Sequence, residues 1–423
     1  MQLESLANRG AEGKQAMRKA PSALVTLVFS IGLLGSVTGA SQERSTRPVV
    51  VLDPGHGWST GTGIIDPGEV SGDLVEKEIT LDVARQAREM LERCDVEVRL
   101  THERDEYGRT EADIAGIVNG HSPTVAVSIH AHSGDPSASG TQAWYTVVGY
   151  NDASSQTLAS MLADSVAGQL SIPNLGALPE SNSALGELAI HEWNAPAAML
   201  ELAFLQGDAD LLRTERRSFA RALARALLGF LGLPLDCADH AEAQGFTLAV
   251  YSPGEAHSNT VALRNDGLLA WEPGSIALRC TGDAYGAPES FPLPQVVEAG
   301  DLVTWDISAT APGTAGILRQ TWQLFQGELP IGDEATVVLI VVPQEATDLK
   351  EEIQRRIEEI AAQGQQQIEQ QLEELRQQIL EAAQQKISGW VKDRMGDICN
   401  SAGAALAAVA LVWSRRRETR RTS

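Results

Sequence analysis

Four side chains that lie far apart in the sequence have the types needed to bind a metal ion and to activate water beside it. His56 follows an apolar run that ends in Pro-Gly, and His130 ends a second apolar, strand-like run. Glu201 ends a third such run, and Glu76 begins a segment whose apolar residues have helical spacing. Two histidines and one carboxylate are a common ligand set for catalytic zinc, and a second carboxylate can act on water at the metal. These residue types therefore indicate a metal site that activates water.

The elements expected around these residues would place them at one edge of a sheet. Strand-like and helix-like segments alternate from Pro48 to Gly232, which predicts an α/β fold with a largely parallel sheet and helices on both faces. In open sheets of this kind, ligands bind at the carboxyl ends of the strands. The expected strands are residues 49–52, 96–101, 125–130, 141–148 (as an edge strand), 188–191 and 197–202. The expected helices are residues 79–91, 111–119, 158–170 and 219–231.

The four side chains belong to short sequence blocks that carry a family resemblance. In chain order, the blocks are Asp53-Pro54-Gly55-His56-Gly57, Glu76-Lys77-Glu78-Ile79-Thr80-Leu81, Ser128-Ile129-His130-Ala131 and Leu200-Glu201-Leu202-Ala203-Phe204-Leu205. They resemble the signature blocks of the zinc-dependent N-acetylmuramoyl-L-alanine amidases of the type-3 family. The resemblance predicts a catalytic domain at residues 47–235. It implies that His56, Glu76 and His130 bind Zn²⁺, and that Glu201 is the catalytic acid/base.

The chain departs from the family pattern at several places. Extra residues, 58–65, precede an Asp-Pro-Gly that starts at Asp66. His132 occupies a position where the family usually has asparagine, and Ala203 replaces a glycine. These departures leave the four chemical residues intact and concern the contacts with substrate. We expect Asp53 to orient the first loop and Asp66 to lie near the cleft.

Other residues compete for the ligand positions. Glu69 and Glu78 are alternatives to Glu76, which could instead be a carboxylate favoured by the positive end of a helix dipole. His132 is the alternative to His130, because residues two apart share a face while a strand continues. The family block favours His130, and His132 is then expected to line the site. The His191-Glu192 pair is expected in a surface turn.

The substrate implied by the resemblance is peptidoglycan, at the amide between the lactyl group of muramic acid and L-alanine. Two other functions remain open from the sequence: a catalytically silent protein that binds murein, and a zinc peptidase that cleaves stem peptides. The 423-residue chain has a formal charge of −23, which argues against nucleic acid as a partner. The charge also argues against broad electrostatic adhesion to anionic wall polymers.

A second domain is expected at residues 246–343. Its short strand-like runs are separated by turn signals such as Asn-Asp-Gly and Glu-Pro-Gly, a pattern typical of a β-sandwich of about one hundred residues. Residues 263–267, Trp271, 311–316 and Trp322 resemble the four-tryptophan immunoglobulin-like domain. Valines stand at two of that family's tryptophan positions. We expect the tryptophans to be core or sheet-face residues.

A long amphipathic helix is predicted at residues 347–392. Apolar residues recur mostly every four positions, with an occasional step of three, so the period is slightly above 3.6 and differs from the 3.5 of a heptad seam. Gly364 would weaken or bend the helix. Two roles remain open: self-association with a right-handed twist, and a stalk beside a membrane, which we favour.

Both ends of the chain resemble targeting or anchoring segments. Residues 1–40 predict a secretory signal peptide, in which Met17 could be the true start, although an uncleaved anchor is the alternative. Residues 397–413 form an apolar segment whose helical length, about 24 Å, is marginal for a hydrocarbon core of about 30 Å. The basic tail, residues 414–423, fits a cytoplasmic end. Together they predict an extracytoplasmic envelope protein tethered to the membrane, although a removable sorting tail or a helix lying on the membrane would also fit.

Four cysteines lie beyond the predicted signal, and their spacing matches no zinc ribbon or redox pair. They are Cys94, Cys237, Cys280 and Cys399. Cys237 and Cys280 could form a disulfide outside the cytoplasm, although the sequence does not determine their separation.

Overall fold

The computed structural model describes residues 47–59, 63–147, 152–183, 188–343 and 350–355. All of them lie in one compact unit, Arg47–Ser423. The predicted signal peptide, the apolar segment at 397–413, the basic tail and most of the predicted long helix lie outside the described residues. Among the described residues, no helix has the length and apolar character needed to cross a membrane.

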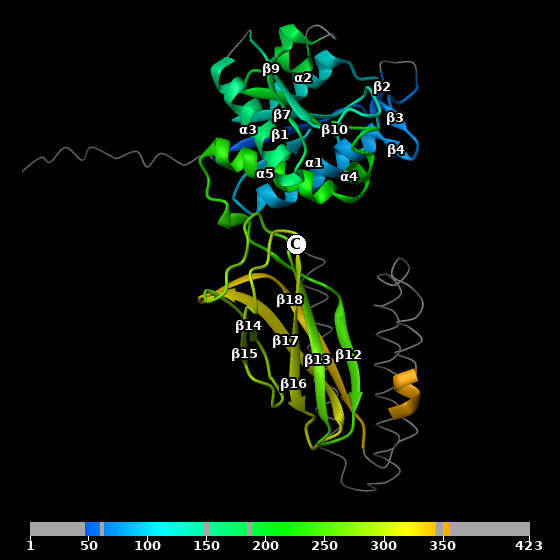
Figure 1. Ribbon diagram of the computed structural model, residues 1–423, viewed down its shortest axis with the longest axis vertical. Coiled ribbons are helices and arrows are strands. Elements are labelled where there is room, and N and C mark those ends of the chain that lie inside the picture. The colour runs from blue at the N-terminus through cyan, green and yellow to red at the C-terminus, as the bar shows by residue number, and fades with distance from the viewer. Residues whose placement is uncertain (1–46, 60–62, 148–151, 184–187, 344–349, 356–423) are drawn as a thin grey trace, which may run out of the picture. The chain divides into compact units, whose positions relative to one another are not determined.

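A six-stranded sheet forms the centre of the first half of the described chain (Figure 1). In spatial order its strands are β5 (Glu97–Leu100), β1 (Val49–Pro54), β7 (Val125–His132), β10 (Ala197–Phe204), β8 (Thr141–Tyr145) and β9 (Asn174–Pro179). The first four strands are mutually parallel, β8 is antiparallel to β10, and β9 is parallel to β8. Strands β1, β7 and β10 are buried along nearly their whole length, as expected for apolar strands covered on both faces.

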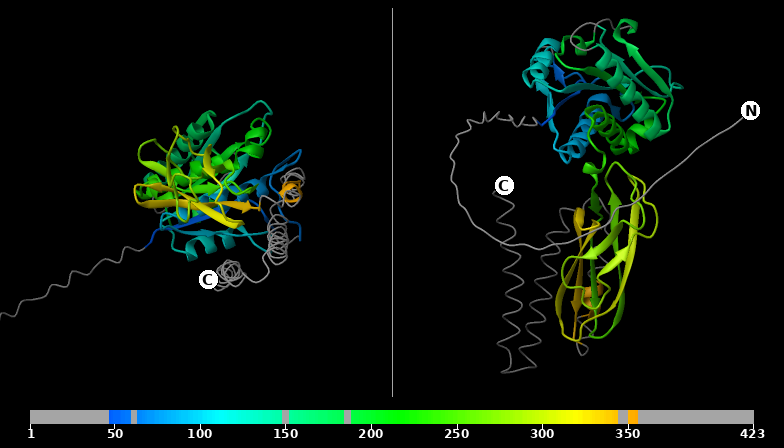
Figure 2. Two further views of the ribbon diagram at one scale, coloured as in Figure 1. Left: turned by 90° about the horizontal axis from the view of Figure 1, so that it is seen from below. Right: turned by 90° about the vertical axis from the view of Figure 1, so that its left-hand side faces the viewer.

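Helices cover both faces of this sheet, as the sequence predicts (Figures 1 and 2). One face shares its core with α1 (Glu76–Glu92), α3 (Asp152–Leu170) and α5 (Arg216–Leu231). The other face packs against α2 (Glu111–Gly120) and the short 3₁₀ helix η2 (Ala189–Glu192). The predicted α/β class is therefore confirmed.

Two details of the predicted sheet are wrong. Residues 188–191, expected as a strand, lie mostly in η2. Leu188 and Ile190 are both buried, which imitates the alternation of a strand although they pack against α2. The segment 141–148 was expected at the sheet edge, but β9, which was not expected, pairs with β8 and occupies that edge. A strand that begins Asn-Leu-Gly-Ala has little β propensity, so its pairing partner must stabilise it.

Several short elements connect the larger ones. They are the two-stranded pairs β2 (Trp58–Ser59) with β6 (Glu106–Tyr107) and β3 (Val70–Ser71) with β4 (Leu74–Val75), the helix α4 (Ala209–Thr214), and the 3₁₀ helices η1 (Glu180–Asn182) and η3 (Asp236–Ala238).

Two further sheets follow, within the region predicted as a second domain. The three-stranded sheet contains β11 (Ala241–Ala243), β13 (Ala256–Asn265) and β16 (Leu302–Thr310). The five-stranded sheet contains β12 (Phe246–Tyr251), β18 (Leu329–Val341), β17 (Gly316–Gln326), β14 (Ile276–Cys280) and β15 (Ser290–Pro292). Residues of both sheets share one apolar core, in which Trp271, Trp305 and Trp322 are buried. The tryptophans are thus core residues, whereas the immunoglobulin-like assignment stays a prediction.

A disulfide joins Cys94 to Cys237, with their Cα atoms 5.0 Å apart, and Cys280 is a free thiol. The suggested Cys237–Cys280 pair is therefore wrong. Cys94 follows α1, and Cys237 follows α5 in the chain; the two helices pack in one core. The packing of helices, which cysteine spacing does not reveal, decides the pairing.

Candidate metal centre

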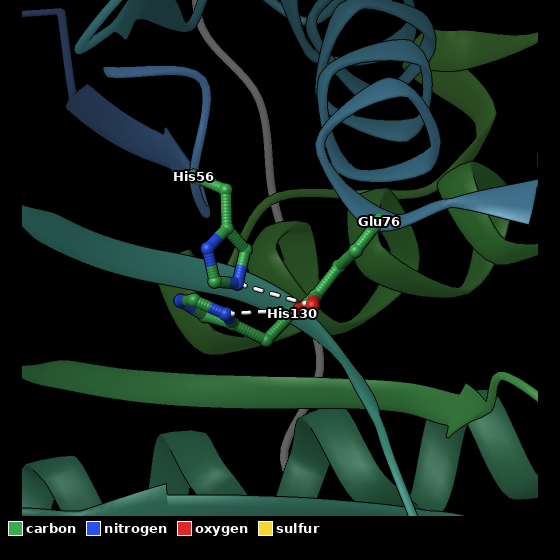
Figure 3. A group of neighbouring side chains, drawn as sticks. All are labelled: His56, Glu76 and His130. Carbon is green, nitrogen blue, oxygen red and sulfur yellow. Dashed lines mark hydrogen bonds and ion pairs between the residues drawn. The ribbon is translucent and has the colours of Figure 1, made fainter. Parts of the chain in front are cut away.

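Three side chains predicted as metal ligands converge beside the carboxyl ends of β1 and β7 (Figure 3). One nitrogen or oxygen from each of His56, Glu76 and His130 lies within 4.8 Å of those of the other two. The Nε2 atom of His56 is 3.1 Å from Oε2 of Glu76, and Nδ1 of His130 is 3.1 Å from Oε1. The carboxylate thus contacts both imidazoles, whose rings lie edge to face with centroids 4.9 Å apart.

The local backbone explains why these residues meet. Strands β1 and β7 are adjacent and parallel, with Pro54 opposite Ile129, so their carboxyl ends bring His56 and His130 together. His56 has a φ of 68°, and the following Gly57 has a φ of 77°. This left-handed turn is costly for a residue with a side chain, and such strain concentrates at functional sites. Glu76 is the first residue of α1.

Backbone amides hold the Glu76 carboxylate in place. Its Oε2 accepts a hydrogen bond from the amide of Glu69 at 2.9 Å, and its Oε1 accepts one from the amide of Ala131 at 2.9 Å. Burial would raise the pKa of Glu76, but the hydrogen bonds with His130 and His56 outweigh it and lower the pKa well below its usual value. The carboxylate is therefore an anionic ligand at neutral pH.

Asp66 contacts the far side of the His56 ring. Its Oδ2 lies 2.7 Å from Nδ1 of His56, and its Oδ1 accepts a hydrogen bond from the amide of Gly68 at 2.9 Å. Burial lowers the pKa of His56, but the bonds to Glu76 and Asp66 raise it to about 9. A carboxylate on the second ring nitrogen fixes the tautomer and orientation of a metal-binding histidine.

Two glycines leave room for the candidate ligands. A Cβ on Gly55 would lie 2.3–2.6 Å from three atoms of the His130 ring. A Cβ on Gly68, where φ is 67°, would lie 2.6 Å from Oε2 of Glu76 and 2.6 Å from Cδ2 of His56. Side chains at these positions would displace the cluster, so the glycines of the two Pro-Gly turns are required by close approach.

Glu201 lies on β10, directly opposite His130 of the neighbouring β7. It is 9% exposed, and its Oε2 has no hydrogen-bond partner among the described residues. Burial raises the pKa of Glu201, which the positive potentials of His130 and His132 only partly offset. A buried carboxylate with a free oxygen and a raised pKa has the properties of a proton carrier.

The competing candidates lie outside this cluster. Strand β7 continues to His132, whose Nε2 is 3.0 Å from Oε1 of Gln142 and whose ring stacks on Phe204 at 4.8 Å between centroids. Among the described residues, the side chains of Glu69 and Glu78 do not belong to the group of converging ligand atoms.

Asp53 and His191 contact side chains outside the ligand cluster. Asp53, expected to orient the first loop, accepts hydrogen bonds from Thr101 at 2.6 Å and Ser128 at 2.9 Å, and so links β1 to the neighbouring strands. His191 is half-buried in η2, with Nδ1 2.9 Å from Oε1 of the buried Glu180.

Sequence reasoning missed the contact between Asp66 and His56 and the close approach of the two glycines. The repeated Pro-Gly, after Asp53 and after Asp66, is the signal that could have indicated two loops folded against one another.

The donor set suits a divalent metal. Two imidazoles and one carboxylate match the three-ligand sets of catalytic zinc sites, which leave a further coordination position open. His56 and Glu76 each have a further interaction that orients them, with Asp66 and with the amides of Glu69 and Ala131, as metal ligands usually do. The unpartnered Oε2 of Glu201 faces no described donor, which fits a carboxylate that serves a bound molecule.

Comparisons with known proteins find similarity to N-acetylmuramoyl-L-alanine amidases. The family model described as N-acetylmuramoyl-L-alanine amidase matches residues 50–231. The chain is 24% identical over 202 residues to N-acetylmuramoyl-L-alanine amidase LytC of Bacillus subtilis, covering 47% of this chain and 38% of that protein. It is 37% identical over 101 residues to N-acetylmuramoyl-L-alanine amidase AmiC of Neisseria meningitidis, covering 23% of each chain. The matches thus cover less than half the length of these two relatives.

Two solved structures are also similar to part of the chain. An N-acetylmuramoyl-L-alanine amidase of Clostridium difficile 630 aligns with 24% identity and a TM-score of 0.39, covering 44% of this chain and 98% of that one. The catalytic domain of CwlV from Bacillus (Paenibacillus) polymyxa aligns with 25% identity and a TM-score of 0.38, covering 44% and 99%. His56, Glu76, His130 and Glu201 all lie in residues 50–231, the part of the chain that matches the N-acetylmuramoyl-L-alanine amidase family.

Proposed function

We propose that residues 47–235 form a zinc-dependent N-acetylmuramoyl-L-alanine amidase that hydrolyses the amide between N-acetylmuramic acid and L-alanine in peptidoglycan. The observation that carries the proposal is the convergence of His56, Glu76 and His130 beside the buried Glu201. The family match over residues 50–231 supports the same activity.

In this proposal, His56, Glu76 and His130 hold the zinc ion. Zinc in such a site would polarise the amide carbonyl and lower the pKa of water, which an unreactive amide requires. Glu76 contributes the negative charge of the ligand set, and Asp66 keeps the Nε2 of His56 directed toward the cluster. The amides of Glu69 and Ala131 fix the position of Glu76.

Glu201 acts as the general acid/base. Its carboxylate takes a proton from the attacking water and passes it to the departing amine of L-alanine. Burial raises the pKa of Glu201, so the acid form is easier to reach during turnover than for an exposed glutamate. His132 and Gln142, paired beside it, line the proposed substrate side of the site.

The substrate determines where the enzyme works, so we propose that the chain acts in the cell envelope outside the cytoplasm. The predicted signal peptide supports this location, and the predicted tether at residues 397–413 would hold the enzyme at the membrane. Both segments lie outside the described residues.

Digestion of purified peptidoglycan tests the activity. We expect new amino-terminal L-alanine on the released peptides, with the glycan strands intact, as identified by mass spectrometry. Cleavage within the stem peptide would show a peptidase instead. Binding to peptidoglycan without any product would leave a silent murein-binding protein.

A further inference from the structure

The outer face of the five-stranded sheet is apolar, although it points away from the core that the two sheets share. On β18, Val337 and Leu339 face the shared core, whereas Val338 and Ile340, with Val342 beyond the strand, belong to a separate apolar cluster. Leu248, Val250 and Ile317 of the neighbouring strands β12 and β17 complete this cluster. A sheet face of this kind requires a cover, because exposed apolar patches are unfavourable in water.

One residue of the segment that follows the sheet already lies on this face. Residues 350–355 are helical, and Ile353, 7% exposed, packs in the same cluster as Val338 and Ile340. The start of this helix is fixed by Lys350, whose Nζ donates to Oε2 of Glu255 at 2.5 Å and to Oγ of Ser252 at 3.3 Å. Ser252 directly follows β12, so the helix begins at the end of the face where β12 and β18 end.

The sequence beyond residue 355 continues the same apolar stripe. Ile357 and Ile360 are four and seven residues after Ile353, so on a helix all three share one side. Seven helical residues span about 10 Å, and the four strand residues from Val342 back to Val338 span about 13 Å. The two apolar surfaces therefore have similar lengths.

The apolar sheet face, followed back from Val342, and the apolar helical stripe, followed forward from Ile353, end after similar distances. Toward the far end of the sheet face, Arg319 and Thr336 form a hydrogen bond of 2.9 Å. On the helical side, Gly364 lies eleven residues after Ile353, about 16 Å along a helix. A glycine there can end the packed part of the helix, because it weakens helix formation.

We infer that residues 350–362 form a helix that docks on the outer face of the five-stranded sheet of its own chain, with Ile357 and Ile360 covering Leu248, Ile317 and Val338. The covering segment belongs to the same chain because Ile353 and Lys350 already hold it there and only residues 343–349 separate it from the face. The docked helix fixes the direction in which the rest of the predicted long helix leaves the sheet. Ile357 and Ile360 are then unavailable for self-association.

Cysteine cross-linking of the full chain tests this docking. Val338→Cys would be combined with Ile357→Cys or with Ile360→Cys, in a background where Cys280 and Cys399 are serine. We expect one of these pairs to form an intramolecular disulfide under mild oxidation, because facing side chains bring Cβ atoms to about 4 Å. The pair Val338→Cys with Ala362→Cys is the control, since Ala362 lies on the opposite side of the helix from Ile353 and should remain unlinked.

Hydrogen exchange of the same chain without cysteine substitutions gives an independent readout. Ile357→Ser with Ile360→Ser should speed exchange of the amides of residues 353–362 by at least about tenfold, since local opening loses the burial of two side chains. The matched pair Glu359→Ser with Ala362→Ser should leave it nearly unchanged. Cross-links only between two chains would assign the face to a second copy, and equal exchange in the two variants would overturn the docking.

Discussion

Glu201 combines burial, a free carboxylate oxygen and a place opposite His130. Replacing it by glutamine keeps its volume but removes the proton that catalysis requires. We expect Glu201→Gln to lower turnover of peptidoglycan by about 10²–10⁴-fold while zinc content stays the same. Metal analysis and product release, measured on one preparation, check both parts. A variant that keeps more than about a tenth of the activity would exclude Glu201 as the acid/base.

The two neighbouring histidines of β7 should respond differently to substitution. His130→Ala removes a candidate ligand and should abolish stoichiometric zinc binding, whereas His132→Ala loses only contacts to Gln142 and Phe204 and should retain the metal. Zinc per chain after dialysis measures the difference. Equal loss of metal from the two variants would contradict the choice of His130.

Asp66 is a positioning residue, since it acts through His56. Asp66→Asn removes the charge that orients the imidazole and should weaken zinc affinity by about 10–100-fold. Titration with a competing chelator measures that affinity. Glu69→Gln is the matched control, because Glu69 contacts Glu76 through its backbone amide and carbonyl and the substitution leaves both in place. A similar effect of both changes would point to a loss of overall charge.

At the level of the elements, the loop that precedes α1 determines whether Glu76 can reach the cluster. Gly68→Ala introduces a Cβ at 2.6 Å from Oε2 of Glu76, at a φ of 67°. Gly72→Ala introduces the same left-handed strain, at 62°, with nothing within 4 Å. Both should cost about 1 kcal/mol of folding stability from backbone strain.

Only Gly68→Ala should also lose zinc and activity, because only there does the new methyl displace a candidate ligand. Thermal unfolding and zinc content, measured for the two variants side by side, separate strain from displacement. If Gly72→Ala loses metal as readily, the loop conformation as a whole matters and the close contact at Gly68 does not.

For the longer strands and helices, the sequence pattern is sufficient to locate the element. Strands β1, β7 and β10 and helices α1, α2 and α5 have long runs of apolar residues at the strand or helix period, and each appears where it was expected to within a few residues. Segments η2 and β9 are short and lack a clear period, so their packing against α2 and β8 decides their conformation.

At the level of the whole molecule, one buried carboxylate connects distant parts of the chain. Asp266, after β13, accepts hydrogen bonds from Arg93 at 2.9 Å and from Arg217 of α5 at 2.7 Å. Burial would raise the pKa of Asp266, but the bonds with Arg217 and Arg93 lower it below its ordinary value. Because Arg93, Arg217 and Arg221 all contact Asp266, this ion cluster ties β13 of the three-stranded sheet to α1 and α5 beside the six-stranded sheet.

This cluster predicts a pH dependence of stability. A carboxyl whose pKa is lower in the folded state stabilises the fold above its unfolded pKa, about 3.9 for aspartate, and loses that contribution as pH falls through the folded pKa. Asp266→Asn should therefore lower the melting temperature most at about pH 6–7, where the carboxyl is ionised in both the folded and the unfolded state. The gap to the unsubstituted chain should shrink below about pH 4. A gap independent of pH would show that packing, and not charge, makes Asp266 important.

The sequence by itself determined the α/β class and the principal strands and helices, and it predicted His56, Glu76, His130 and Glu201 as the candidate site. It could do so because period, turn residues and short ordered blocks are local properties of a chain. Tertiary structure alone decided that Cys94 pairs with Cys237, that Asp66 contacts His56, and that the outer face of the five-stranded sheet receives Ile353. Each of these three contacts joins segments that are apart in the sequence, and the packing of helices and strands brings those segments together. Packing depends on the summed burial of many side chains, and therefore no single stretch of the sequence contains it.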